Sequence, residues 1–185
     1  MEGSMRFLAL QGINHRAFYL KFLCDENAIS IRSIAEVGTW RGETAELLRA
    51  LFPKAHLYLI DSWNPSPEYI ERGVPCSLHV GDYEACFKEV SEFFEKDPRV
   101  SIIRKTSLEG VKDVPDGVDL VFIDADHSYK HVKQDIETWR KKVRKGGLLS
   151  GHDFSTKFPG VMQAVKESFP GNFIVGRDTV WATII

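Results

Sequence analysis

The chain has 185 residues, of which 43% are hydrophobic, and a formal net charge of -2. These values predict a single domain, residues 1–185, with a sizeable core. The scattered basic residues give no support to nucleic acid binding, and no apolar run is long enough to cross a bilayer. The three cysteines lack metal-ligand spacing and the N-terminus lacks a signal-peptide pattern, so we expect free thiols and a cytoplasmic protein.

Residues 1–30 are predicted to form an N-terminal helical extension. Phe18 and Phe22 lie four residues apart within the stretch 14–23, and this interval places both on one face of a helix. We expect the helix to pack against a sheet, or to lie over the mouth of a ligand site and shape its substrate side.

The stretch from Ser33 to Asp61 organises the rest of the chain. It contains a short apolar strand at 34–37, a glycine turn from Gly38 to Gly42, an amphipathic helix, and a second strand that stops at Asp61. A strand, a crossover helix and a strand in this order predict a parallel sheet, whose ligands lie at the carboxyl ends of the strands.

The glycine turn restricts what this site can bind. A dinucleotide turn needs a second glycine two residues after the first, but Trp40 stands there. Backbone amides at the start of the helix can still receive a carboxylate, and Asp61 stands where such folds place an acid for ribose hydroxyls. These features favour a ligand with a ribose and a carboxylate but no phosphate, and S-adenosylmethionine fits that description.

The segment after Asp61, residues 62–81, is rich in proline and glycine. It is predicted to be a loop with a short helical turn at 68–72. Long loops at the strand ends of open sheets commonly carry function, so we expect this loop to contribute specificity for the substrate. Trp63 either flanks the adenosine or the substrate, or pins the loop in place.

The alternation of helices and strands continues beyond this loop. Asp82 is predicted to cap a helix, and a strand follows at 99–104. The nearly continuous apolar run at 119–124 predicts a strand that is buried on both faces. These elements extend the parallel sheet.

Ser128 is predicted to cap the next helix, whose apolar spacing continues to Val143. Four basic residues precede Gly146 and Gly147, which would end this helix. Because cations complement the carboxyl end of the helix dipole, we interpret the basic run as a solvated helix end and not as a nucleic acid patch.

The last part of the chain adds a strand at 148–151, a helix at 161–169, and two strands at 173–176 and 179–185 joined by a turn. The complete pattern predicts an α/β fold. We expect one doubly wound, Rossmann-like domain with a seven-stranded, mostly parallel sheet and a C-terminal antiparallel hairpin.

Carboxylates and histidines gather at the ends of two strands that should be neighbours. Asp124 and Asp126 follow one of these strands, and His152 and Asp153 follow the next. Methyl transfer to a hydroxyl requires removal of its proton, which a histidine base or a divalent metal can achieve. We therefore expect Asp124, His152 and Asp153 to activate an acceptor.

The motifs EVGTWRG, LYLID, FIDADHSY and GHDF occur in this order. They resemble those of class I S-adenosylmethionine-dependent methyltransferases and are most similar to the macrocin-type O-methyltransferases, from Ile34 to the C-terminus. The resemblance implies methyl transfer to a hydroxyl of a small molecule, while the residues leave nitrogen open as the acceptor atom. The cofactor contacts that it implies are Glu36, Gly38, Thr39, Gly42, Asp61, Ser62, Ser107, Leu108 and Asp124.

The same resemblance raises the question of a metal. In metal-dependent relatives one acid matches Asp124, and two adjacent ligands match His152 and Asp153. Carboxylate oxygens suit Mg2+, so Asp124 and Asp153 are its candidate ligands. His152 stands where an acid is often found, which leaves it open as a ligand, a base or neither. A carboxylate can equally bond backbone amides without any metal.

Three other interpretations stay open. Tyr129 and Lys133 match the Tyr-x-x-x-Lys pair of short-chain dehydrogenases, a short match without the dinucleotide turn. Asp124 and Asp126 match the metal-binding motif of nucleotide-sugar glycosyltransferases, which leaves the glycine turn without a role. The chain could also bind S-adenosylmethionine without turning it over, as a sensing module or as the non-catalytic partner of a larger enzyme.

Overall fold

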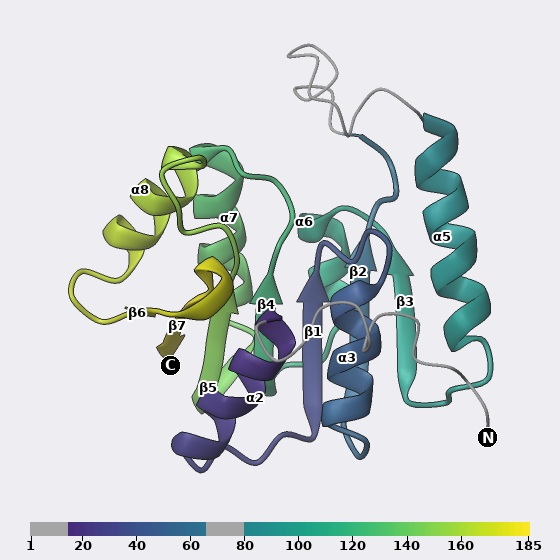
Figure 1. Ribbon diagram of the computed structural model, residues 1–185, viewed down its shortest axis with the longest axis horizontal. Coiled ribbons are helices and arrows are strands. Elements are labelled where there is room, and N and C mark those ends of the chain that lie inside the picture. The colour runs from purple at the N-terminus through teal and green to yellow at the C-terminus, as the bar shows by residue number, and fades with distance from the viewer. Residues whose placement is uncertain (1–14, 66–79) are drawn as a thin grey trace.

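A computed structural model of the chain describes residues 15–65 and 80–185. In this part of the chain, seven strands form a sheet in the order β3-β2-β1-β4-β5-β7-β6 (Figure 1). Strands β1 to β5 run parallel, whereas β7 is antiparallel to β5 and to β6. The predicted fold is confirmed. The strands are β1 (Ser33–Val37), β2 (His56–Asp61), β3 (Val100–Arg104), β4 (Val118–Ile123), β5 (Val143–Gly151), β6 (Ile174–Val175) and β7 (Trp181–Ile184).

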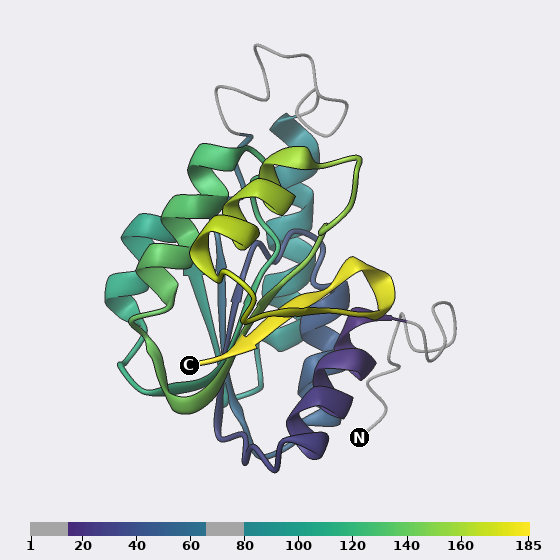
Figure 2. The same ribbon diagram turned by 90° about the vertical axis from the view of Figure 1, so that its left-hand side faces the viewer.

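Helices cover both faces of the sheet (Figure 2). Helices α2, α3 and α5 bury their apolar side chains on one face, and α7 and α8 do so on the other. None of the helices in the described ranges is long and apolar enough to cross a membrane. The helices are α2 (Arg16–Glu26), α3 (Glu43–Leu51), α5 (Val80–Phe94), α6 (Ser107–Gly110), α7 (Tyr129–Trp139) and α8 (Pro159–Ser168), with the short 3-10 helices η3 (Val111–Asp113) and η4 (Arg177–Thr179).

The predicted N-terminal helix is present as α2, but one of its two spaced phenylalanines faces the solvent. Ala17 and Leu20 are fully buried, and Leu23 is nearly so, whereas Phe22 is 51% exposed. Phe18 and Phe22 lie four residues apart, as residues on one face of a helix do. The smaller side chains of Ala17, Leu20 and Leu23, on the neighbouring face, are buried more deeply. Phe18 and Tyr19 are partly buried against the same core, so the aromatic pattern marks part of the packed face and Phe22 is the exception.

Strands β1 and β4 lie side by side at the centre of the sheet. All six residues of β4 are buried, because helices cover the sheet on both faces, as the continuous apolar run predicts. The strand order reverses between β1 and β4, with β2 and β3 on one side and β5 on the other. Open α/β sheets bind their ligands at such a reversal, beyond the carboxyl ends of the strands.

The turn after β1 requires glycine at its first position. Gly38 has φ of +93°, and a Cβ atom added there would lie 2.1 Å from the carbonyl oxygen of Asp124. The turn is therefore packed directly against the backbone that follows β4. This contact fixes the glycine turn relative to Asp124.

Gly38→Ala should lower the free energy of unfolding by more than the ~1–3 kcal/mol that a left-handed conformation costs a side chain. The excess comes from the clash with the Asp124 carbonyl. Gly117→Ala is the matched control, because Gly117 has φ of +86° and nothing within 4 Å of an added Cβ atom. Urea unfolding measures both variants, and equal losses of stability would show that the close contact is unimportant.

Helix α7 is shorter than predicted. Ser128 is its N-cap, as expected, but the helix ends at Trp139. Val143, which continues the helical spacing, instead begins β5 and pairs with Val118 of β4. The glycines at 146–147 lie inside β5 and do not end the helix. Val143 matches the helical spacing by coincidence, because the spacing of apolar residues indicates which residues are buried and not whether they belong to a helix or a strand.

The basic run between α7 and β5 also has a different role from the predicted one. Lys142 Nζ donates to the carbonyl oxygen of Val114 at 2.8 Å, and Arg144 Nε donates to the buried carboxylate of Asp119 at 2.5 Å. Lys142 and Arg144 therefore link the start of β5 to Val114 and Asp119, which lie before and within β4. They do not form a solvated helix end.

Three further predictions concern the middle of the chain. Asp82 lies within the first turn of α5 and does not cap it, because the helix begins at Val80. The helical turn predicted at 68–72 and Cys76 lie outside the described residues. Cys24 and Cys86 are free thiols, as predicted.

Candidate functional site

The carboxyl ends of β1, β2, β4 and β5 meet at one edge of the sheet. The glycine turn leaves β1, Asp61 ends β2, Asp124 follows β4, and His152 and Asp153 follow β5. These residues come from segments that are far apart in the sequence. The structure therefore brings the residues predicted from four strands to the reversal point of the sheet.

Two buried polar atoms near the glycine turn have no partner among the described residues beyond the mutual contact of their two side chains. They are Oε2 of Glu36, a residue that is 2% exposed, and Oγ1 of Thr39. Burial raises the pKa of the Glu36 carboxyl to about 8, because a buried anion loses its hydration. Unpaired buried polar groups are costly. These atoms therefore fit a ligand that brings its own ammonium and carboxylate groups, as S-adenosylmethionine does.

Ionisation of the buried Glu36 should lower the free energy of unfolding of the wild type as the pH rises, and Glu36→Gln should remove this effect. The pKa of Glu36 is about 8 in the folded protein and near its ordinary value of 4.5 in the unfolded chain, so the folded protein binds the extra proton between these pH values. Its free energy of unfolding should fall by up to about 1.4 kcal/mol per pH unit from about pH 5 to about pH 8.

Urea unfolding of the wild type, Glu36→Gln and the exposed control Glu92→Gln between about pH 5 and 8 measures this effect. The Glu36 variant should gain stability over the wild type as the pH rises, while Glu92, 68% exposed, should show no such trend. A constant difference between the wild type and Glu36→Gln would contradict the raised pKa.

Asp61 ties the glycine turn to the end of β2. Its Oδ2 accepts the backbone N–H of Trp40 at 2.8 Å, and its Oδ1 accepts the N–H of Trp63 at 2.7 Å. Burial raises the pKa of this carboxyl, and the amides oppose that rise. The backbone amides of Thr39 and Ser62 also stabilise the ionised carboxyl, so the glycine turn and the end of β2 surround it with N–H groups. The adjacent Ser62 hydroxyl donates to the carbonyl of Asn64 at 3.1 Å.

Trp63 is buried beneath the contact between the glycine turn and the end of β2. It is 1% exposed, its indole N–H donates to the carbonyl of Trp40 at 2.8 Å, and its ring lies 5.1 Å from that of Phe87. Of the two roles that the sequence left open, these contacts support the one that pins the loop. Trp40 is 48% exposed and presents apolar surface beside the turn.

Ser107 and Leu108, the predicted adenine contacts, begin α6. The Ser107 hydroxyl donates to the carboxylate of Asp135 at 2.5 Å and accepts the indole N–H of Trp139 at 2.8 Å. Burial raises the pKa of Asp135 to about 6. The Ser107 side chain is therefore engaged in packing α6 against α7, whereas Leu108 is 38% exposed and offers apolar surface.

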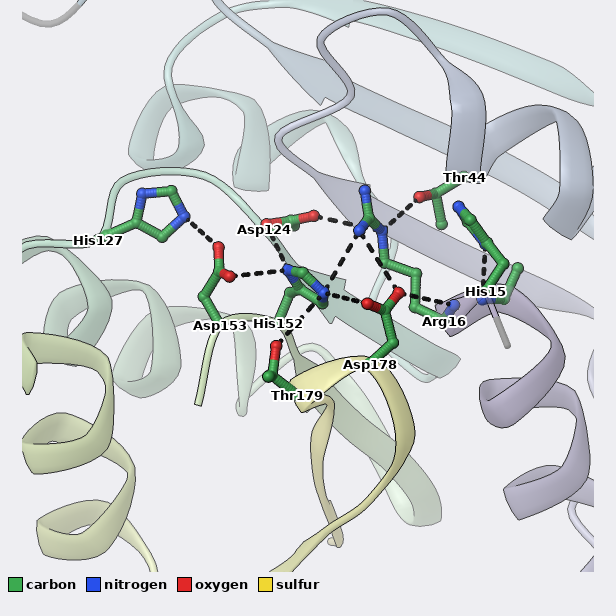
Figure 3. Close-up of polar contacts among 10 residues, drawn as sticks. His15, Arg16, Thr44, Asp124, His127, His152, Asp153, Asp178 and Thr179 are labelled. Carbon is green, nitrogen blue, oxygen red and sulfur yellow. Dashed lines mark hydrogen bonds and ion pairs between the residues drawn. The ribbon is translucent and has the colours of Figure 1, made fainter. Parts of the chain in front are cut away.

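His152 lies among three carboxylates (Figure 3). Its Nδ1 is 3.2 Å from Asp153 Oδ1 and 3.6 Å from Asp124 Oδ1, and its Nε2 is 3.5 Å from Asp178 Oδ1. Burial alone would lower the pKa of His152, but hydrogen bonds to Asp153 and Asp178 and the charge of Asp124 raise the pKa to about 9. The carboxylates therefore favour the charged form of the imidazole, whereas the Arg16 guanidinium, whose Nη1 lies 3.3 Å from His152 Nε2, opposes it.

Asp153 is held from both sides. Its Oδ2 lies 2.7 Å from Nε2 of His127, whose ring stacks on Phe158 at a centroid distance of 4.3 Å. Burial alone would raise the pKa of Asp153, but the two histidines hold it well below its usual range. His127 therefore joins the predicted residues Asp124, His152 and Asp153 in one group, which we call the strand-end cluster.

Sequence patterns did not indicate that Arg16, Thr44 or Asp178 belongs to the site. Arg16 Nε donates to Thr44 Oγ1 at 2.8 Å and lies 3.5 Å from Asp124 Oδ2, and its backbone N–H donates to Asp178 Oδ2 at 3.1 Å. The one available signal was the expectation that the N-terminal helix lies over the ligand site. Asp178 and Thr179 both have positive φ, 52° and 53°, a strained geometry typical of functional sites.

The strand-end cluster only partly fits a divalent metal. One ligand atom each from Asp124, His152 and Asp153 lie within 4.8 Å of one another, which is compatible with a shared cation. However, the Asp124 oxygens face Arg16 and His152, and the Asp153 oxygens face His127 and His152. While these partners are in place, the donor set does not fit a metal.

The residues of the rival interpretations have other partners. The Tyr129 hydroxyl donates to Glu167 at 2.6 Å and Lys133 Nζ donates to Ser168 at 3.1 Å, so both side chains face α8. Asp126 Oδ1 accepts the backbone N–H of Ser128 at 2.7 Å. Asp126 therefore holds the turn before α7.

Comparisons with known proteins bear on the identity of this site. The methyltransferase-domain family matches residues 35–154. An uncharacterized protein of Acanthamoeba polyphaga mimivirus is 39% identical over 186 residues, covering 90% of this chain and 78% of that protein. The O-methyltransferase NovP has the same fold, with a TM-score of 0.70 and 18% identity over 94% of this chain and 80% of its own. The O-methyltransferase from Bacillus cereus, solved in complex with SAH, gives a TM-score of 0.60 and 16% identity over 91% and 80%.

The family match extends from β1 to the residue after Asp153 and so includes the glycine turn, Asp61 and the strand-end cluster. The chain therefore belongs to the methyltransferase-domain family and is an S-adenosylmethionine-dependent methyltransferase.

Proposed function

We propose that this enzyme transfers the methyl group of S-adenosylmethionine to a hydroxyl of a small molecule. The observation that carries the proposal is the strand-end cluster, which lies beside the glycine turn and exceeds what cofactor binding requires. The resemblance to macrocin-type O-methyltransferases and the O-methyltransferases of the same fold support it. The proposed cofactor contacts are Glu36, Gly38, Thr39, Gly42, Asp61, Ser62, Ser107, Leu108 and Asp124.

The residues of the turn and of β2 would hold the cofactor in a single orientation. When bound, S-adenosylmethionine supplies a methyl group on a sulfonium, which is displaced in line by the acceptor. Glu36 accepts from the ammonium group, and Thr39 donates to the carboxylate. Asp61, which the backbone amides of Trp40 and Trp63 hold in place, accepts from the ribose hydroxyls.

The strand-end cluster would activate the acceptor. Asp124 is the best placed base: burial raises its pKa, whereas the two histidines lower that of Asp153. The acceptor hydroxyl transfers its proton to Asp124, while an N–H group of His152 and the guanidinium of Arg16 stabilise the negative charge that develops on the oxygen. Asp153 and His127 keep the imidazole of His152 in place.

A methyl-transfer assay tests this proposal. Sugars, phenols and polyketide-like hydroxyl compounds are each supplied with S-adenosylmethionine that carries a labelled methyl group, next to the amine of the same skeleton. Label should pass to at least one hydroxyl compound and not to its amine. Transfer to amines alone would contradict an oxygen acceptor, and tight cofactor binding without any transfer would favour a non-catalytic binding module.

A further inference from the structure

Arg16 reaches from the start of α2 into the strand-end cluster (Figure 3). Its Nε lies 3.5 Å from Asp124 Oδ2, and its Nη1 lies 3.7 Å from Asp178 Oδ2 and 3.3 Å from His152 Nε2. Its guanidinium therefore faces two carboxylates, from the end of β4 and from η4. Such a fork of fixed N–H donors suits carboxylates well.

The surrounding structure fixes this arginine in position. The next residue of α2, Ala17, is fully buried, and the N-cap His15 accepts its backbone N–H at 3.2 Å. One turn further on, Tyr19 packs so closely on Gly176 that a Cβ atom there would lie 2.0 Å from the tyrosine ring. Helix α2 is therefore tightly packed against the segment that holds Asp178. The Arg16 side chain is only 22% exposed, so it is not a loose surface arginine.

The position of Arg16 matters because a metal would compete with it. A divalent cation shared by Asp124, His152 and Asp153 would need an oxygen of Asp124. One oxygen of this carboxylate faces the guanidinium and the other faces His152. Two cations a few ångströms apart in a partly buried site repel each other strongly. A metal and the docked Arg16 therefore compete for the same negative charge.

We propose that Arg16 is the resident cation of the acceptor side, in the place that a divalent metal takes in metal-assisted methyl transfer. A metal binds at Asp124, His152 and Asp153 only when the charge of Arg16 is removed. The catalytic part of this inference, that transfer proceeds without a metal, rests on the proposed O-methyltransferase function. The binding part rests on the contacts of Arg16 alone. Arg16 becomes a specificity-determining residue for the kind of cation that the site uses.

Calorimetric titration with Mn2+ tests the binding part. Arg16→Met should bind Mn2+ saturably. The wild type should show no saturation over the same range of Mn2+ concentrations, because its affinity should be at least about tenfold lower. Arg16→Lys keeps a cation and should exclude the metal, and Arg16→Met with Asp153→Asn should lose the site again. The matched control is Arg49→Met, because Arg49 forms an equally buried ion pair with Asp97, remote from the strand ends. Saturable Mn2+ binding to the wild type, or none to Arg16→Met, would overturn the proposal.

Two further measurements distinguish a variant that does not fold from a failure of the Arg16 proposal or of the proposed function. Thermal unfolding and titration with S-adenosylhomocysteine show whether each variant is folded; if Arg16→Met is not, Arg16→Gln replaces it in the titration with the same expectation. In the transfer assay, wild-type turnover should be unaffected by a chelator, while Arg16→Met should be slower and regain activity with Mn2+. Loss of wild-type turnover in the chelator would overturn the catalytic part. If no acceptor is methylated, the proposed function fails, but the Mn2+ titration still decides the role of Arg16.

Discussion

Replacing Asp153 with asparagine should lower the rate of methyl transfer by about 10²- to 10³-fold, the usual cost of losing a donor that stabilises a developing oxyanion. Asp153 binds His152 through one oxygen and His127 through the other. Its loss releases the imidazole that stabilises the acceptor oxygen. The affinity for S-adenosylhomocysteine should stay unchanged, because no predicted cofactor contact depends on this carboxylate.

Asparagine is the appropriate replacement because Asp153 has φ of +60°, a left-handed conformation that asparagine tolerates better than alanine does. The matched control is Asp113→Asn, an exposed carboxylate whose partner is Lys105 at 2.7 Å. This control should retain full turnover and full affinity. If Asp153→Asn loses affinity and turnover to the same extent, the division between a cofactor side and an acceptor side is wrong.

Asp61→Ala should weaken the binding of S-adenosylhomocysteine by about 100-fold or more. Hydrogen bonds to a charged group contribute about 1.5–3 kcal/mol each, and two ribose hydroxyls are proposed to bind this carboxylate. The same change removes the acceptor of the Trp40 and Trp63 amides, which loosens the glycine turn itself. Both effects act on the cofactor side.

Calorimetric titration measures this loss, and two further variants make it interpretable. Asp61→Asn keeps one acceptor oxygen and should fall between the wild type and Asp61→Ala. Asp116→Ala removes an exposed carboxylate that pairs with Lys142. Asp116 lies just before β4, at the amino end of that strand and away from the site, so this variant should bind S-adenosylhomocysteine normally. An unchanged affinity in Asp61→Ala would exclude this residue from the cofactor site.

Much of the fold follows from local patterns. The apolar strand, the glycine turn and the strand that stops at Asp61 each carry their own signal, because a buried parallel strand needs a continuous apolar run and the turn needs glycine. Parallel strands bring their carboxyl ends to one edge, so the closeness of Asp124 and His152 also follows from the sequence. The end of α7 does not, since Val143 satisfies the helical spacing and the strand pairing alike.

The cationic part of the site depends on contacts that no local pattern records. The backbone N–H of Arg16 donates to Asp178 across a separation of 162 residues, and the side chain reaches Asp124 from a helix that precedes β1. Ser107 shows the same limit, since its hydroxyl is engaged by Asp135 and Trp139 of α7. Side-chain partners of this kind are decided by packing between elements, which composition and spacing do not specify.

The most direct test of the central claim is a calorimetric titration of the wild-type protein with S-adenosylhomocysteine. Saturable binding at one site per chain is the predicted result, because Glu36, Thr39 and Asp61 are the proposed contacts to the ammonium, carboxylate and ribose groups of this ligand. The absence of saturable binding to the folded protein would contradict the cofactor site and, with it, the methyl transfer proposed at the strand-end cluster.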